Sequence, residues 1–455
     1  MYLRKASTIR FITLILSITL LFAAFTINPS QANTPNTVLL AEQPLSEYKA
    51  RREKLLEKIQ DGIVVVLASE EDDLGVGSKF RQNDNFMYLT GVDVPDSALV
   101  LVPKGYQGAK EWLFLPTPNP FMDQWTGPRP NISEQTAQAF GVERVASLKD
   151  LQKTLEEIVR TPNFQKSGEK VYTVIPPSNY TRLVREEKFT EQLRKISATV
   201  NLNPIAPFLA DQRMLKSEPE LSLIKRAIDI TEQAHKDVLK NVKPGMFEYE
   251  LEALILGQFY RNGAQRPAFP CIVGSGINST ILHYEKNRKK IEDNDLIVVD
   301  IGAEYNYYAA DITRTYPANG RFTPRQREIY KLVLAAQTAA AKAFEPGKST
   351  MHDLDAVARQ VMRESSLKDS KGRSLDQFFP HGLGHFVGMY VHDVGDYSRP
   401  LPVGAVITIE PGIYLPDEKI GVRIEDDYLV TSTGLVKLSQ NVPSEPEALE
   451  KLMVK

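Results

Sequence analysis

The sequence has one cysteine, no surplus of either charge and only six histidines. With Cys271 alone, it can form no intrachain disulfide and no metal site built from several thiolates. Lysine plus arginine number 55 against 57 for aspartate plus glutamate, a net charge of −2. The chain therefore lacks the basic surplus that polyphosphate binding needs, and we expect no nucleic-acid partner. A composition of 42% hydrophobic and 25% charged residues excludes a disordered chain, a fibrous repeat and a polytopic membrane protein.

Long apolar runs are scarce, and the one near the start predicts an export signal. Three basic residues precede the run 11–27, whose 17 residues are short for a membrane span, and Ser30-Gln31-Ala32 supplies small residues at a cleavage site. We therefore predict a signal peptide over 1–32 and a linker over 33–44, in an exported protein that is periplasmic or secreted. Retention of the run as an uncleaved anchor is the alternative.

The remaining 423 residues are too many for one core, so we predict two domains in an α/β chain. Residues 45–200 read as an N-terminal α/β domain, with helices over 48–59, 133–140 and 148–159 and strands over 63–68, 86–89, 98–102 and 112–115. This part contains no histidine, which favours a supporting, substrate-screening or oligomerising role. Three prolines mark a linker over 201–219. The catalytic domain would span 220–440, and 441–455 would be a C-terminal tail.

An internal echo divides the C-terminal part into two similar halves. Pro244-Gly245 and Pro346-Gly347 each precede an amphipathic helix. Each half then has a strand ending in an acid, Asp300 or Glu410, followed by a second acid on a second short strand, Asp311 or Glu425. Two such halves packed about a pseudo-twofold axis would bring the four carboxylates together.

These carboxylates sit in apolar strands, where an unpaired charge is costly. Arg314 and Arg423 could pair with two of them, which leaves two unexplained. A pair of divalent cations would neutralise all four, and oxygen ligands suit Mn²⁺ or Mg²⁺, with Zn²⁺ an alternative if a histidine joins. Two metals held about 3.5–4 Å apart can activate water and polarise a carbonyl.

Four of the six histidines fall beside these strands: His283, His381, His385 and His392. The glycines of His381-Gly-Leu-Gly-His385 argue against the zinc-peptidase helix motif, which also needs a glutamate after its first histidine. One of the four can ligate a metal, while the others can bind or protonate a substrate. His235 and His352 read as structural or exposed.

Seven ordered motifs in the chain resemble the aminopeptidase P and prolidase group of the pita-bread metallopeptidases. The motifs are Leu-His283-Tyr, Asp300-Ile-Gly, Asp311-Ile-Thr-Arg-Thr, His381-Gly-Leu-Gly-His385, Val-His392-Asp, Thr-Ile-Glu410-Pro-Gly and Arg423-Ile-Glu425-Asp-Asp. The segment from Phe80 to Gly91 is also similar to that group's N-terminal, creatinase-like domain. The resemblance covers about residues 45 to 440 and implies an N-terminal α/β domain followed by an α+β pita-bread domain.

The resemblance also implies a role for each site residue. Asp300 would bind one metal, Asp311 and Glu425 would bridge both, and His385 and Glu410 would complete the second ion's ligands. Glu410 would also take the proton of the attacking water. His283, His381 and His392 would line the substrate pocket, and Arg423 would orient the carboxylates from outside the ligand set.

The implied activity is hydrolysis of the N-terminal Xaa-Pro bond of proline-containing peptides. The resemblance implies two metal ions, Mn²⁺ first with Zn²⁺ or Co²⁺ as alternatives, in a homo-oligomer, either a dimer or a tetramer. A prolidase that cleaves Xaa-Pro dipeptides is the nearest alternative. A non-enzymatic binding protein or a creatinase-like amidinohydrolase on this fold is disfavoured, because all five ligand types are present.

Overall fold

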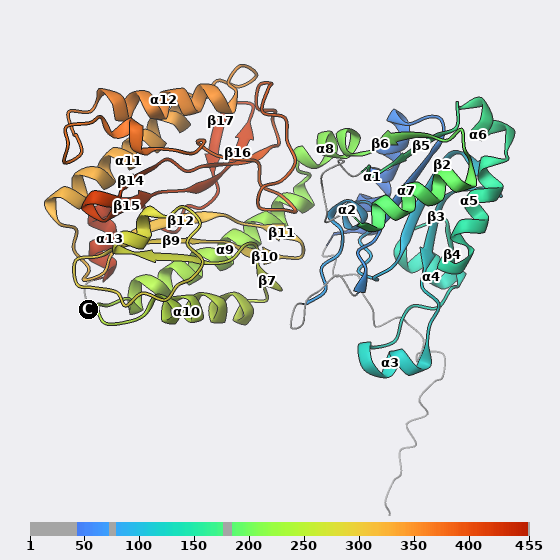
Figure 1. Cartoon of the computed structure of the whole chain (residues 1–455), viewed down its shortest axis with the longest axis horizontal. Coiled ribbons are helices and arrows are strands. Elements are labelled where there is room, and N and C mark those ends of the chain that lie inside the picture. The colour runs from blue at the N-terminus through green and yellow to red at the C-terminus, as the bar shows by residue number, and fades with distance from the viewer. Residues whose placement is uncertain (1–42, 72–78, 176–183, 454–455) are drawn as a thin grey trace, which may run out of the picture. The chain divides into compact units, whose positions relative to one another are not determined.

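A six-stranded sheet forms the centre of the N-terminal part in the computed structural model, which describes residues 43–71, 79–175 and 184–453 (Figure 1). The strand order is β4-β3-β2-β1-β5-β6, with β1 antiparallel to β2 and parallel to β5. The strands are β1 (Ile63–Leu67), β2 (Ala98–Tyr106), β3 (Ala109–Leu115), β4 (Arg144–Ser147), β5 (Lys170–Thr173) and β6 (Asn201–Pro204).

Helices cover both faces of this sheet, because successive apolar residues of a strand point to opposite sides. Val64 and Val66 pack on one face with residues of α1 (Leu45–Lys58), α2 (Asp84–Thr90), α4 (Glu134–Phe140) and α8 (Ala206–Met214). Ile63 and Val65 pack on the other face with α5 (Leu151–Val159), α6 (Pro162–Lys166) and α7 (Val184–Ile196). The remaining elements of this part are α3 (Pro120–Thr126) and the short helix η2 (Leu148–Asp150).

Two local expectations for this part differ from the structure. Residues 86–89 were expected to form a strand but lie in helix α2, because Asn83 caps its first turn and Gly91, at φ +67°, ends it. The expected linker over 201–219 contains β6 and α8. Its prolines end the outermost strand or lie in the first turn of a helix, positions where a missing N–H costs little.

The C-terminal part contains the same order of elements two times, namely two helices followed by a three-stranded sheet. Helices α9 (Glu218–Asn241) and α10 (Glu248–Arg261) precede the sheet β12-β9-β8, and helices α11 (Pro324–Lys342) and α12 (Met351–Glu364) precede the sheet β13-β16-β17. The strands of these two sheets are β8 (Ile272–Ser275), β9 (Leu296–Ile301), β12 (Ile312–Pro317), β13 (Val406–Ile409), β16 (Asp426–Thr431) and β17 (Gly434–Lys437).

A third three-stranded sheet with the order β11-β10-β7, the strand pair β14-β15 and three short helices complete this part. The strands are β7 (Arg266–Pro267), β10 (Ala303–Tyr305), β11 (Tyr308–Ala309), β14 (Gly412–Leu415) and β15 (Ile420–Arg423), and the short helices are η3 (Gly276–Thr280), η4 (Leu375–Phe378) and η5 (Pro416–Glu418). A shared apolar core joins α9–α12 to both sheets. The expected tail contains α13 (Pro446–Met453), which buries Leu449 and pairs Glu447 and Glu450 with Arg327.

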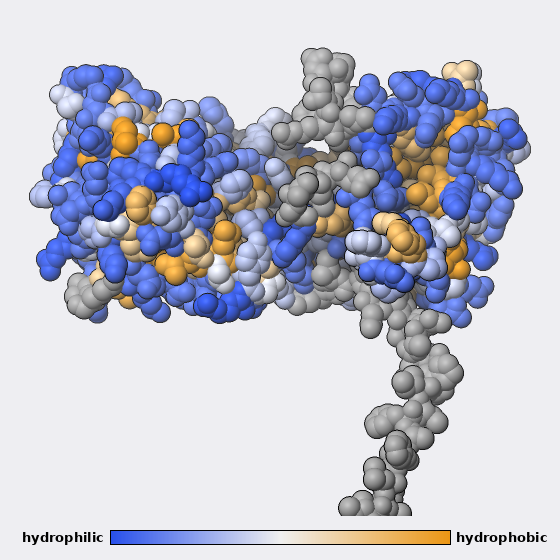
Figure 2. Space-filling model, turned by 60° about the horizontal axis from the view of Figure 1, so that its bottom comes forward, coloured by the Kyte–Doolittle hydropathy of each residue, from blue (hydrophilic) through white to orange (hydrophobic). Residues whose placement is uncertain are grey.

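The predicted signal peptide and nearly all of the 33–44 linker lie outside the described residues. Within the described ranges, no helix has the length and apolar character needed to cross a bilayer. The face of the molecule in Figure 2 is mostly hydrophilic, with apolar side chains gathered in several separate patches. Such scattered apolar groups are normal on a folded protein surface.

Candidate metal centre

Four carboxylates meet because each lies at or beside the end of an antiparallel strand pair. Asp300 lies near the end of β9, opposite Thr313 of β12, and Asp311 immediately precedes β12. Glu410 follows β13 and Glu425 precedes β16, at the end where Ile409 pairs with Asp426. The two halves therefore supply two acids each to one cavity.

His385 reaches these acids because its loop runs against β13. The backbone N–H of Thr408 donates to the carbonyl of His385 at 2.9 Å, and that of Glu410 donates to the carbonyl of Leu383 at 2.8 Å. A side chain at Gly384 would collide with the Thr408 carbonyl, so this approach requires glycine.

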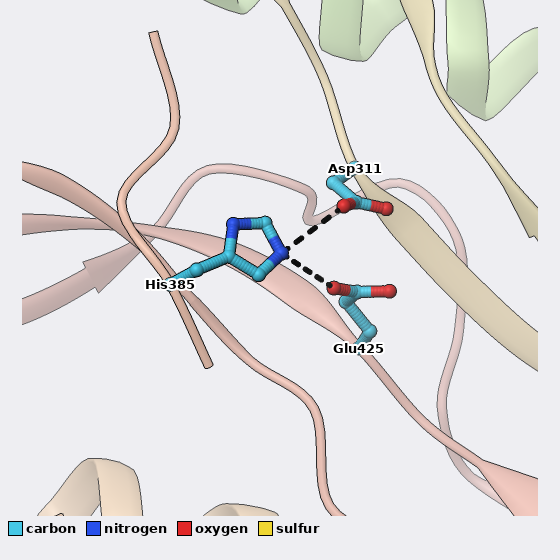
Figure 3. Close-up of side chains that lie close together, drawn as sticks. All are labelled: Asp311, His385 and Glu425. Carbon is cyan, nitrogen blue, oxygen red and sulfur yellow. Dashed lines mark ion pairs between the residues drawn. The ribbon is translucent and has the colours of Figure 1, made fainter. Parts of the chain in front are cut away.

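The imidazole of His385 then points at the carboxylates (Figure 3). Its Nε2 lies 3.4 Å from Asp311 Oδ2, 3.5 Å from Glu410 Oε1 and 4.0 Å from Glu425 Oε1. Asp311, His385 and Glu425 offer ligand atoms that all lie within 4.8 Å of one another.

Arg423 forms hydrogen bonds that connect Asp300, Tyr414 and Thr313. Its Nη2 donates to Asp300 Oδ2 at 2.6 Å, and its Nη1 donates to the Tyr414 hydroxyl at 2.9 Å. Thr313 Oγ1 accepts from Arg423 Nε at 3.3 Å and donates to Glu425 Oε2 at 2.6 Å. The suggestion that Arg314 pairs with a second site carboxylate is wrong.

Arg314 instead forms an ion pair with buried Asp426 at 2.7 Å. It reaches Glu425 only through the backbone carbonyl, at 2.7 Å. Arg314 lies on β12, where side chains alternate between the faces, so it points away from the face that carries Thr313.

The buried acids outnumber the cations beside them, and their pKa values show it. Burial raises the pKa of Glu425 to about 8, with the charge of Asp300 adding to the effect. Burial and the neighbouring carboxylates also raise the pKa of Asp311 and of Glu410 well above the usual range. Within the described residues, buried Asp300 Oδ1 and Asp311 Oδ1 have no hydrogen-bond partner. Buried carboxylate oxygens without a hydrogen-bond partner, together with one imidazole, fit a site for divalent cations.

The neighbouring histidines are held neutral. Burial lowers the pKa of His385 to about 3 and that of His381 to about 4, and it also lowers the pKa of His392. Neutral imidazole is the form that binds a metal or accepts a proton. His381 Nε2 lies 2.9 Å from the Tyr414 hydroxyl, and the rings of His385 and His392 lie 4.2 Å apart.

A cavity of about 500 Å³ contains all the residues that the sequence assigned to the site. Its lining includes Asp300, Asp311, His385, Glu410, Glu425, His283, His381, His392 and Arg423. His235 lies outside this lining, buried between the Tyr316 hydroxyl and the Ile312 carbonyl, and His352 is exposed on α12.

Thr313, Tyr414 and Tyr397 are among the polar residues of the site that the sequence did not predict. Thr313 could have been found, because it lies two positions after Asp311 on a strand and so shares its face. Tyr414 touches both His381 and Arg423, and Tyr397 lines the cavity. Nothing in the local sequence distinguishes these tyrosines from core aromatics.

The chain matches two known families, one over each part. Residues 222–432 match metallopeptidase family M24, and residues 48–165 match the N-terminal domain of aminopeptidase P. The Xaa-Pro aminopeptidase of Escherichia coli is 34% identical over 443 residues, or 91% of this chain and 99% of that protein. The Xaa-Pro aminopeptidase of Haemophilus influenzae is 36% identical over 91% of this chain and 98% of its own length. The chain belongs to metallopeptidase family M24.

Solved structures of aminopeptidases have the same architecture. Aminopeptidase PepP of Pseudomonas aeruginosa superposes with a TM-score of 0.81 at 32% identity, covering 90% of this chain and 98% of that one. A zinc-substituted aminopeptidase P of Escherichia coli in complex with product superposes with a TM-score of 0.81 at 31% identity. The match covers 91% of this chain and 99% of that one. The predicted resemblance to aminopeptidase P, the two-domain fold with a pita-bread domain, and the hydrolase class are confirmed.

Proposed function

We propose that this M24 protein is a dinuclear-metal aminopeptidase that removes the first residue from peptides with proline in second position. One observation carries the proposal: five metal-ligand side chains of the required types converge in one cavity, with two buried carboxylate oxygens lacking any partner among the described residues. The specificity for proline rests on the relatives, which are named Xaa-Pro aminopeptidases over nearly the whole chain.

The residues divide into a metal-holding set and a substrate-facing set. Asp300, Asp311, His385, Glu410 and Glu425 would hold two divalent ions, with Asp311 and Glu425 between them. When bound, these ions supply Lewis acidity for the scissile carbonyl and activate the attacking water. We propose Mn²⁺ as the metal, with Zn²⁺ or Co²⁺ as alternatives.

The protein's own groups move the protons. Glu410 accepts the proton of the water as its oxygen bonds to the carbonyl carbon before proline. When the carbon–nitrogen bond breaks, that proton passes to the proline nitrogen. His381 and His392, neutral because of burial, and His283 line the cavity and would hydrogen-bond the peptide on either side of the reacting bond.

Hydrolysis of two peptides, together with metal analysis, tests the proposal. Purified protein should contain two metal ions per chain and convert Ala-Pro-Ala to alanine and Pro-Ala. Ala-Ala-Ala, the matched control without proline, should be cleaved far more slowly. Cleavage of the dipeptide Ala-Pro with no action on Ala-Pro-Ala would make the protein a prolidase. No hydrolysis of either peptide by the metal-loaded protein would support a binding role instead.

The cellular setting is a further part of the proposal. The basic start, the apolar run and the small residues before Asn33 support export to the periplasm or outside the cell. The first residue of the native protein should therefore be Asn33, and full-length protein in a cytoplasmic fraction would contradict export.

We also propose a homo-oligomer, dimer or tetramer, which light scattering of the purified protein tests.

A further inference from the structure

The loop that carries His283 is held by one buried carboxylate outside the metal centre. This loop, residues 276–289, leaves β8 and returns toward β9, bringing Leu282, His283 and Glu285 to the cavity. His283 is exposed, and within the described residues no hydrogen bond holds its imidazole. The position of this imidazole therefore depends on how the loop backbone is fixed.

Glu248, the first residue of α10, fixes both ends of the loop. At the beginning, its Oε1 accepts from the Ser275 N–H at 2.8 Å, the Ser275 hydroxyl at 2.7 Å and Asn278 Nδ2 at 3.2 Å. At the end, its Oε2 accepts from the Tyr284 hydroxyl and from the Lys289 N–H, both at 2.8 Å. The backbone N–H of Glu248 also donates to the Lys289 carbonyl at 3.0 Å.

Within the part of the chain that the structure describes, no cation pairs with the Glu248 carboxylate. Glu248 is fully buried, and all five donors to its side chain are neutral groups. A buried charge is tolerated only when its acceptor sites are filled, and hydrogen bonds to a charged acceptor are about twice as strong as neutral ones. Every one of the five lies in Ser275 or in the loop, so this buried charge orders the loop.

The Tyr284 hydroxyl transmits this order to the site, because Tyr284 is the next residue after His283. Its side chain is nearly buried, and its ring is tethered to Glu248. A second tether lies at Asn287, which accepts from the Val273 N–H at 3.0 Å and donates to the Cys271 carbonyl at 2.8 Å. His283 is thus an exposed side chain on a backbone anchored after it by Tyr284 and Asn287, and before it by Arg423, whose Nη2 donates to the Leu282 carbonyl at 3.4 Å.

We propose that Glu248 is a positioning residue: its buried carboxylate, through Tyr284, holds His283 at the place in the cavity where the substrate peptide binds. This inference deepens the proposed function, since the role of His283 toward peptides rests on it. The carboxylate of Glu248 touches neither substrate nor metal and acts only through the loop.

The test compares Tyr284→Phe and Glu248→Gln with Tyr249→Phe, which removes the hydroxyl of a neighbouring, partly exposed tyrosine. A displacement of about 1 Å in a substrate-positioning group costs on the order of 10²-fold in rate. We expect Tyr284→Phe to lower kcat/KM for Ala-Pro-Ala by about 10- to 100-fold with the metal content unchanged. Tyr249→Phe should leave both quantities at the wild-type level.

A double-mutant cycle separates positioning from a general structural effect. If the network acts through His283, adding Tyr284→Phe to His283→Ala should change kcat/KM by less than about twofold. The same loss in both backgrounds would overturn the proposal. Loss of metal in Tyr284→Phe would also overturn it, because Arg423, which pairs with Asp300, reaches the Leu282 carbonyl at 3.4 Å.

A measurement without substrate keeps this inference separate from the proposed activity. In spectra of the full chain labelled at histidine, the His283 signal is the one absent from His283→Ala. It should shift or broaden in Tyr284→Phe and Glu248→Gln and stay unchanged in Tyr249→Phe. An unchanged His283 signal in the first two variants would refute the positioning role. If the signal moves while the wild type cleaves no proline peptide, positioning stands and the proposed function fails.

Discussion

At the scale of single residues, replacing Asp311 should have the greatest effect on metal binding. It lies 3.4 Å from His385 among carboxylates that repel one another, and a bound cation would offset this repulsion. Asp311→Asn keeps the size of the side chain but removes the charge, so metal affinity should fall by more than about 100-fold, beyond the range seen when only a hydrogen bond to a ligand is lost. Metal analysis after gel filtration measures this. Asp293→Asn, at an exposed acid, is the control, and two retained metals in Asp311→Asn would refute the bridging role.

His392 should respond in the opposite way. It lines the cavity beside His385 but is assigned to the substrate. His392→Ala should therefore keep its metals while kcat falls by about 10² to 10⁴, the range for loss of a proton-transfer or hydrogen-bonding partner. Steady-state kinetics with metal analysis measures both quantities, and exposed His352→Ala controls for loss of an imidazole. Loss of metal from His392→Ala would make His392, rather than His385, the better ligand.

At the scale of elements, one amide on α11 (Pro324–Lys342) holds the two backbone segments that lead into Glu410 and Glu425, two of the proposed ligands. Gln337 Nε2 donates to the Ile409 carbonyl at 2.9 Å, the Ile424 carbonyl at 3.2 Å and Asp426 Oδ2 at 3.0 Å. The first two carbonyls immediately precede Glu410 and Glu425.

Replacing this amide should therefore loosen the backbone on the N-terminal side of both proposed ligands. Gln337→Leu leaves buried acceptors unsatisfied, which costs about 1–3 kcal/mol of the free energy of unfolding. Metal affinity should fall together with the melting temperature. Thr338→Ala, at an exposed position of the same helix, should change neither. Normal metal affinity in a destabilised Gln337→Leu would show that the strands hold their position without α11.

The same scale shows what the sequence could predict and what it could not. The acids at strand ends were found because alternation and apolar runs locate strands, as at β9 and β13. Residues 86–89 were misassigned because four apolar residues fit a strand or a helix, and only the caps at Asn83 and Gly91 decide. Tyr414 was missed because its contacts to His381 and Arg423 depend on which strands pair, and no local pattern encodes that pairing.

At the scale of the whole molecule, the clustered acids should make stability depend on pH once metal is removed. Glu425 has a pKa of about 8 when folded against an ordinary value of 4.5. Between these values the folded state binds more protons than the unfolded state, so the free energy of unfolding falls as pH rises. The melting temperature of chelated protein should therefore drop from about pH 5 to about pH 8, and Glu425→Gln should flatten this slope. Equal slopes for chelated Glu425→Gln and wild type would contradict this origin.

The two parts of the chain share buried groups, so the C-terminal part should not be self-sufficient. One apolar cluster contains Leu55 and Phe86 of the first part together with Ile224 and Val387 of the second. Arg213 of α8 donates to buried Asp393 at 2.5 Å, and Asp393 follows His392 in the chain. A fragment of residues 217–455 would expose the apolar cluster and leave Asp393 without its guanidinium, which costs about 3–5 kcal/mol for a buried pair.

We therefore expect the fragment to be poorly soluble and to melt well below the full chain. In the full chain, Arg213→Gln should lower the melting temperature. It should also lower kcat/KM, because Arg213 holds Asp393 and Asp393 is the residue next to His392, while the metal content stays normal. Arg399→Gln, at an ion pair whose two side chains are about half exposed, is the matched control because such pairs contribute at most about 1 kcal/mol. A soluble fragment with wild-type kcat/KM would show instead that the C-terminal part folds and works alone, and that the shared cluster serves only to attach the N-terminal domain.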